Sequence, residues 1–207
     1  MFNPLGSFSP TSPIAPALLS KARAFMETLP TLPPQAHLNR IYYHWAVAPM
    51  GCEFKDYDAM ADVVNDAWVL KITGSPVENA MGAPDESMHT WHRNSHAFGI
   101  AIAGMDGATA SNFGPDPITL AGLDHLCAAG AAVARKYMID LSESFGGEPA
   151  LMTHAEAAVA DLYFGERWDL ATFVPLPSGV ALSPSFAKIC GDALRARTRA
   201  LKMLLPP

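Results

Sequence analysis

Apolar residues form short runs along the chain, and these runs predict buried β-strands. Residues 41–46 and 98–103 are almost continuously apolar over the length of one strand, a pattern typical of strands covered on both faces. Residues 57–64 and 67–73 are two further runs, and Asn65-Asp66 between them predicts a hairpin turn. The sequence therefore predicts a sheet that includes one antiparallel pair.

Other segments carry apolar residues at helical spacing, most clearly the run through Leu120, Leu123 and Leu126. Ser183-Pro184 is a favourable helix start, with a capping hydroxyl followed by proline in the first turn. The predicted helices cover residues 17–28, 119–137, 155–162 and 183–205. Residues 150–153 predict a short strand that delivers His154. Stretches rich in Pro, Gly, Asn or Ser predict loops at residues 3–16, 74–85, 104–117 and 165–168.

Alternating strand and helix signals place the chain in the α/β class. With 207 residues and 50% hydrophobic content, one compact domain with a substantial core is expected. The predicted division is an N-terminal arm and short helix packed on the domain at 1–38, a catalytic domain at 39–176 and a C-terminal helical extension at 177–207.

Charge and cysteine content limit the possible partners. The net charge of −6 argues against general nucleic-acid binding, which usually requires a basic face. Cys52, Cys127 and Cys190 are an odd and widely spaced set that indicates free thiols. No apolar run of 18 or more residues predicts a transmembrane segment, and the first residues show no Sec-type signal.

Three residues are candidate metal ligands. His44 ends the first apolar run, His154 follows the strand predicted at 150–153, and Asp169 follows the loop at 165–168. Two imidazoles and one carboxylate leave the fourth tetrahedral position of a zinc ion open, as in catalytic rather than structural sites. Seven histidines permit many such triples, so the order and context of these residues carry the hypothesis.

That order resembles the zinc-dependent N-acetylmuramoyl-L-alanine amidases of type 2, a superfamily that includes phage lysozyme-like amidases and peptidoglycan recognition proteins. The resemblance covers about residues 39–169. In that family a first zinc histidine ends a strand, a block with a histidine and an asparagine precedes a Gly-containing apolar strand, and a second histidine and a third ligand follow a helix. His89 and Asn94, before the apolar run at 98–103, match the block.

The resemblance implies an α/β fold, a central mixed β-sheet flanked by helices, and a Zn²⁺ ion held by His44, His154 and Asp169. It implies that His89 and Asn94 line the substrate groove. Tyr57 and Arg167 take the places of catalytic groups: a tyrosine beside the zinc water, and a cation that stabilises an oxyanion.

The chain departs from the family pattern at three positions. Many bacterial members have a catalytic glutamate in the strand where this chain has Ala101, so the glutamate mechanism is not transferred. Arg167 replaces a frequent lysine and keeps the positive charge, but it cannot donate a proton near neutral pH. Asp169 is followed by Leu170 and not by the usual Pro-Gly.

The resemblance implies a peptidoglycan amidase that cleaves between N-acetylmuramic acid and L-alanine. Because no export signal is visible, a lytic enzyme that reaches the periplasm or cell wall by holin release or specialised secretion is expected, either a phage endolysin or a secreted antibacterial effector with a possible immunity protein or secretion partner. One alternative is a non-catalytic peptidoglycan-binding recognition module. Another is a zinc hydrolase that acts on small amides.

Single residues also have structural interpretations. His44 among aromatic residues could be a hydrogen-bonded core histidine, and Tyr57 could be ordinary strand packing. Glu156 is expected to orient the metal shell or to cap a helix. Arg93 is expected to lie in a solvated loop. The second half of the C-terminal helix presents cations that suit either an anionic surface or a core-facing helix whose cations lie near its negative end: Arg195, Arg197, Arg199 and Lys202.

Overall fold

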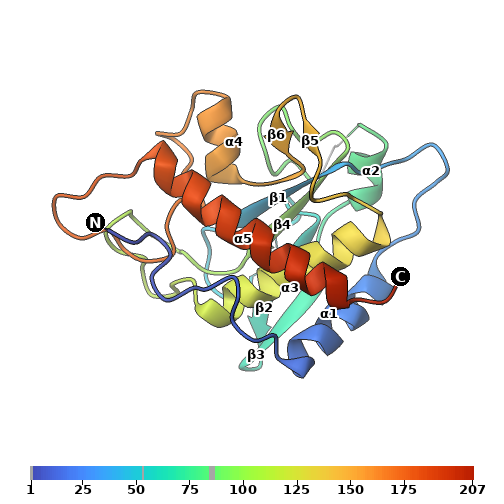
Figure 1. Ribbon diagram of the computed structural model, residues 1–207, viewed down its shortest axis with the longest axis horizontal. Helices are drawn as coiled ribbons and strands as arrows, with labels where there is room; N and C mark the ends of the chain where they lie inside the picture. Colours follow the sequence, from blue (N-terminus) through green and yellow to red (C-terminus); the bar gives the residue numbers. More distant parts are fainter. Residues whose placement is uncertain (1, 53, 84–86) are drawn as a thin grey trace.

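A computed structural model describes residues 2–52, 54–83 and 87–207. It is an α/β structure with a mixed five-stranded sheet in the order β3-β2-β4-β1-β7 (Figure 1). The strands are β1 (Arg40–Trp45), β2 (Ala59–Val64), β3 (Ala67–Ile72), β4 (Ala97–Ile102) and β7 (Leu151–Thr153). The pair β2–β3 is antiparallel, and the other neighbours in the sheet are parallel. The predicted α/β class and mixed sheet are confirmed.

The β2–β3 hairpin turns at Asn65 and Asp66, as predicted. Both residues have positive φ, 50° and 62°, as a two-residue type I′ turn requires, and Asn and Asp tolerate this conformation better than most residues. β2 begins at Ala59, two residues later than predicted, so Tyr57 lies in the preceding loop.

Three helices, α1 (Pro16–Thr28), α3 (Leu120–Lys136) and α5 (Pro184–Leu204), cover one face of the sheet (Figure 1). Side chains alternate along a strand, so Ile41, Tyr43 and Trp45 of β1 join the core beneath these helices. Tyr42 and His44 point to the opposite face, where loop residues rather than a long helix pack against β4 and β2. The metal-site candidates lie on this loop-covered side.

Segments at both ends of the chain contribute to the main core. Phe8 and Phe25 precede the first strand, and Leu194 and Leu201 lie on α5; all four are buried in one cluster with the sheet residues. The three cysteines are free thiols. Within the part of the chain that the structure describes, no helix is long and apolar enough to cross a membrane.

The four cations in the second half of α5 contact the rest of the protein. Arg195 and Arg197 are buried and pair with carboxylates. Arg199 and Lys202 donate to the backbone carbonyls that follow α3, those of Leu141 and Ile139. The helix therefore packs on the core, as the core-facing interpretation predicted.

Some local predictions were wrong. The segment predicted as a loop at 74–85 contains a short helix, α2 (Pro76–Ala80), and a small hairpin of β5 (Ser144–Phe145) and β6 (Glu148–Pro149) was not predicted. α5 has proline in its first turn, but its N-cap residue Ser183 makes no capping hydrogen bond; its hydroxyl lies 2.8 Å from that of Ser185.

Candidate metal centre

The parallel pairing of β1 with β7 brings the two histidines together. Tyr43 is in register with Thr153, so the next residue on each strand, His44 and His154, emerges at the same edge of the sheet. β7 ends at Thr153, one residue before His154, which is the first residue of α4 (His154–Ala160). The two ligands therefore come from a strand end and from the helix start beside it.

A capping box fixes the start of α4. The Thr153 hydroxyl accepts from the Glu156 backbone N–H at 3.1 Å, and the Glu156 carboxylate accepts from the Thr153 N–H at 3.0 Å. Such reciprocal bonds satisfy amide groups that the first helical turn leaves unpaired. Glu156 thus caps a helix, one of the two roles predicted for it, and the capped turn orients His154.

Asp169 completes a triangle of ligand atoms. Nδ1 of His44 lies 3.1 Å from Nδ1 of His154, and Oδ2 of Asp169 lies 3.5 Å from the His44 nitrogen and 3.1 Å from the His154 nitrogen. Two atoms bound at Zn–N distances in a tetrahedral site are separated by about 3.3 Å. The three atoms therefore already have the spacing of ligands around one small cation, and all three residues are buried.

Protonation in this cluster favours cation binding. Burial lowers the pKa of His44 to about 4, so its imidazole is neutral near pH 7. Burial alone would raise the pKa of Asp169, but the nearby His154 imidazole and its hydrogen bond to the carboxylate hold that pKa below the ordinary value. A neutral imidazole and an ionised carboxylate are the forms that bind metal. The group can hold a metal ion.

Two of the three candidate ligands border a cleft of about 530 Å³. The largely buried side chains of His154 and Asp169 line it, together with Tyr57 and Arg167. The Tyr57 hydroxyl donates to the Trp45 carbonyl at 3.2 Å, and its ring centroid is 5.2 Å from that of His44. The side chain of Arg167 is exposed and donates to the Glu166 carbonyl. The structure thus gathers both predicted catalytic residues around the ligands.

A second hollow, of about 690 Å³, joins the cleft at His154. Asn94 borders it, and its side-chain oxygen accepts the Thr90 N–H at 2.7 Å. His89 lies behind the wall that the two hollows share, with its side chain fully enclosed. Of the two predicted groove residues, Asn94 is half-buried beside the groove, whereas the His89 imidazole lies beneath its surface.

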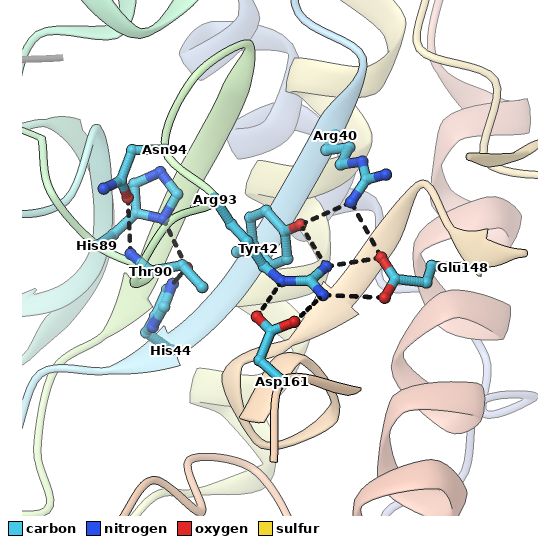
Figure 2. A network of polar contacts seen from close by, with 9 residues as sticks. All are labelled: Arg40, Tyr42, His44, His89, Thr90, Arg93, Asn94, Glu148 and Asp161. Atoms are coloured by element: carbon cyan, nitrogen blue, oxygen red, sulfur yellow. Dashed lines mark hydrogen bonds and ion pairs between the residues drawn. The ribbon is translucent and has the colours of Figure 1, made fainter. Parts of the chain in front are cut away.

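Arg93 is not a solvated loop residue, contrary to expectation. Its guanidinium binds Glu148 through two hydrogen bonds, of 2.6 and 2.9 Å, and Asp161 through two more, of 2.5 and 2.6 Å (Figure 2). These contacts attach the 89–94 loop to β6 and to the end of α4. The pairing carboxylates are more than fifty residues away in sequence, so no local pattern indicates them.

Two further residues near the cleft gave no signal in the sequence. The Thr90 hydroxyl lies 3.2 Å from Nε2 of His44. The indole of Trp91 is 61% exposed and stands between the second hollow and a third of about 700 Å³. Both residues reach these positions only because the fold places the 89–94 loop across the end of β1.

No family model, curated protein or solved structure matches the chain. Its geometry therefore carries the functional argument.

Proposed function

We propose that the protein is a zinc-dependent peptidoglycan amidase that hydrolyses the amide bond between N-acetylmuramic acid and the L-alanine of the stem peptide. The single observation that carries the proposal is the buried triangle of His44, His154 and Asp169, of which His154 and Asp169 line an open cleft. Sequence order and a mixed sheet flanked by helices agree with the type 2 amidase resemblance. Zinc is the ion proposed because two imidazoles and one carboxylate suit it.

The chain's own residues supply the remaining chemistry. A Zn²⁺ ion bound here would lower the pKa of a water molecule and polarise the substrate carbonyl. Arg167 in the cleft wall would stabilise the negative charge that develops on the carbonyl oxygen during hydrolysis. Tyr57 would orient the attacking water or assist the leaving amine through its hydroxyl.

Ala101 carries no catalytic group in this proposal. It is in register with His44 across the β1–β4 pair and is fully buried, so the position expected for a family glutamate is a small apolar residue. Among the described residues, the carboxylates that line the cleft besides Asp169 are Asp56 and Glu166. The proposed mechanism therefore depends on Tyr57 and Arg167 rather than on a strand carboxylate.

The test is zinc content measured alongside the release of stem peptides from purified sacculi, comparing the native chain with His154→Ala. Mass spectrometry should detect muramic acid freed from L-alanine only with the zinc-loaded native protein. Zinc and sacculus binding without cleavage would favour the recognition module. Absence of zinc would overturn the site itself.

The proposed biological setting is a lytic enzyme that acts in the periplasm or cell wall, as a phage endolysin or a secreted antibacterial effector. The partners proposed with this setting are a holin or a secretion apparatus, and for an effector an immunity protein in the producing cell. Expression targeted to the periplasm of a Gram-negative host should cause lysis that His154→Ala does not cause.

A further inference from the structure

A chain of polar contacts runs from the metal centre into the protein. Nε2 of His44 lies 3.2 Å from the Thr90 hydroxyl, which lies 2.9 Å from Nδ1 of His89 (Figure 2). On its far side, Nε2 of His89 is 3.8 Å from Oδ2 of Asp58. All four residues are buried. The proposed mechanism does not use the last three of them.

Neighbouring groups hold this chain in place. The Asp58 carboxylate accepts the Gly99 backbone N–H at 2.8 Å and the Asn79 amide at 3.0 Å. His89 packs directly against Gly99, where any Cβ would collide with the imidazole. The Thr90 N–H is bonded to the side chain of Asn94. The series of contacts from His44 to Asp58 is therefore a fixed part of the fold beneath the cleft.

The chemistry of the four groups gives the chain a direction. A neutral imidazole has one N–H and one lone pair, and a hydroxyl donates only one hydrogen bond. If Nε2 of His89 faced the Asp58 carboxylate with a lone pair, the two would repel, whereas an N–H there is attracted. His89 therefore accepts the Thr90 proton at Nδ1, and Thr90 in turn accepts the N–H of His44 at Nε2.

We propose that Thr90, His89 and Asp58 are positioning residues that fix the proton of His44 on Nε2, so that its Nδ1 is held as a metal-binding lone pair. This inference rests on the proposed metal site and adds to it the groups that select the tautomer of one ligand. Hydrogen bonds of this kind to ligating histidines typically change metal affinity 10–100-fold.

The test measures Zn²⁺ affinity by chelator competition at pH 8, where Asp58, whose pKa burial raises to about 7, is ionised. Thr90→Val removes the hydroxyl at nearly constant volume and should weaken zinc binding 10–100-fold, and Thr90→Ser should restore it to within about threefold. Thr198→Val is the matched control, because it removes an equally buried hydroxyl that bonds to Tyr43 on the helix-covered side. It should leave zinc affinity unchanged.

A second measurement reads the tautomer directly. Nitrogen-15 NMR of the metal-free native protein should show His44 protonated on Nε2, and His89→Phe, which keeps Thr90 but removes its acceptor, should give a mixture of tautomers. His44 protonated on Nδ1, or equal zinc affinity of Thr90→Val and the native chain, would overturn the inference. If the native protein binds zinc and shows the expected His44 tautomer but leaves sacculi intact, only the amidase proposal is refuted. No zinc binding by the native chain would refute both proposals.

Discussion

The guanidinium of Arg195 on α5 binds the carboxylate of Glu156 through two parallel hydrogen bonds, each 2.8 Å long. Arg195 also donates to the Leu151 carbonyl at 3.0 Å. One C-terminal side chain thus holds both the strand that precedes His154 and the helical turn that contains it. The close approach is possible because Gly191 has no side chain where the Glu156 carboxylate lies.

Arg195→Met should destabilise the fold substantially. The substitution leaves the Glu156 carboxylate, whose side chain is 11% exposed, without its guanidinium partner. Breaking a buried pair from one side costs about 3 kcal/mol or more. Urea unfolding should detect this loss. Lys188→Met is the control, because it removes the exposed Lys188–Asp192 pair of the same helix and should cost less than about 0.5 kcal/mol. Equal losses of unfolding free energy in the two variants would show that the Arg195–Glu156 pair does not stabilise the fold more than an exposed pair does.

The elements that the sequence predicted well have strong local signals. The hairpin at Asn65-Asp66 follows from turn residues between apolar runs, and α3 follows from helical spacing along seventeen residues. The grouping of His44, His154 and Asp169 also agreed with the sequence-based expectation. That expectation required the residue order of a known family, because spacing alone did not single out these three residues.

The features that were missed depend on contacts distant in sequence. α2 has only five residues within a Gly- and Pro-rich segment, too few to show an apolar period. Arg93 resembles a loop residue until the fold brings Glu148 and Asp161 to it. Thr90 is an ordinary threonine locally, and its link to His44 exists only because the 89–94 loop crosses the end of β1.

The stability of the metal-free protein should depend on the protonation of His44. Burial lowers the pKa of His44 from 6.5 to about 4, so between these pH values the unfolded chain binds a proton at this site that the folded chain excludes. Stability therefore falls as pH falls through this window, by up to about 3 kcal/mol. Asp169, with a lowered pKa, stays ionised in both states over most of the same range.

Urea unfolding of the native chain and His44→Gln between pH 4 and 7.5 tests this dependence. Other titrating groups are common to both proteins, so the difference isolates His44. The stability advantage of the native chain over the variant should shrink as pH falls from 6.5 to 4. Parallel curves would show that His44 is not buried in its neutral form.

Tyr57→Phe should lower kcat on muropeptides by about 10²-fold, the range for loss of a positioned acid–base group. Zinc affinity should not change, because the hydroxyl donates to the Trp45 carbonyl rather than to a ligand. Tyr137→Phe is the matched control, since its hydroxyl also donates to a backbone carbonyl, that of Pro30, away from the cleft. Full activity of Tyr57→Phe would limit Tyr57 to packing.

Arg167→Gln should also lower kcat by about 10²-fold while leaving zinc affinity unchanged, because the proposed role of the guanidinium is to stabilise transition-state charge. Arg167→Lys keeps that charge in the cleft wall and should recover part of the loss. Arg23→Gln, an exposed arginine on α1, controls for the change in net charge. If the Lys and Gln variants are equally impaired, shape rather than charge is the contribution of Arg167.

Trp91→Ala should weaken the binding of polymeric substrate without slowing the chemical step. The indole is 61% exposed and packs edge-on against Tyr163, at a centroid distance of 5.7 Å, so it presents an apolar surface between two hollows at little conformational cost. The binding free energy gained when substrate covers this surface is the same in the ground state and in the transition state. Its loss therefore raises KM and leaves kcat unchanged.

Steady-state kinetics on sacculi should therefore show KM increased about tenfold for Trp91→Ala, corresponding to about 1.4 kcal/mol of lost apolar contact, with kcat within about twofold. Met203→Ala removes an apolar side chain that is 85% exposed on α5, away from the cleft, and should change neither constant. A fall in kcat would instead place Trp91 among the groups that organise the metal centre, through Tyr163 and its contact with His154.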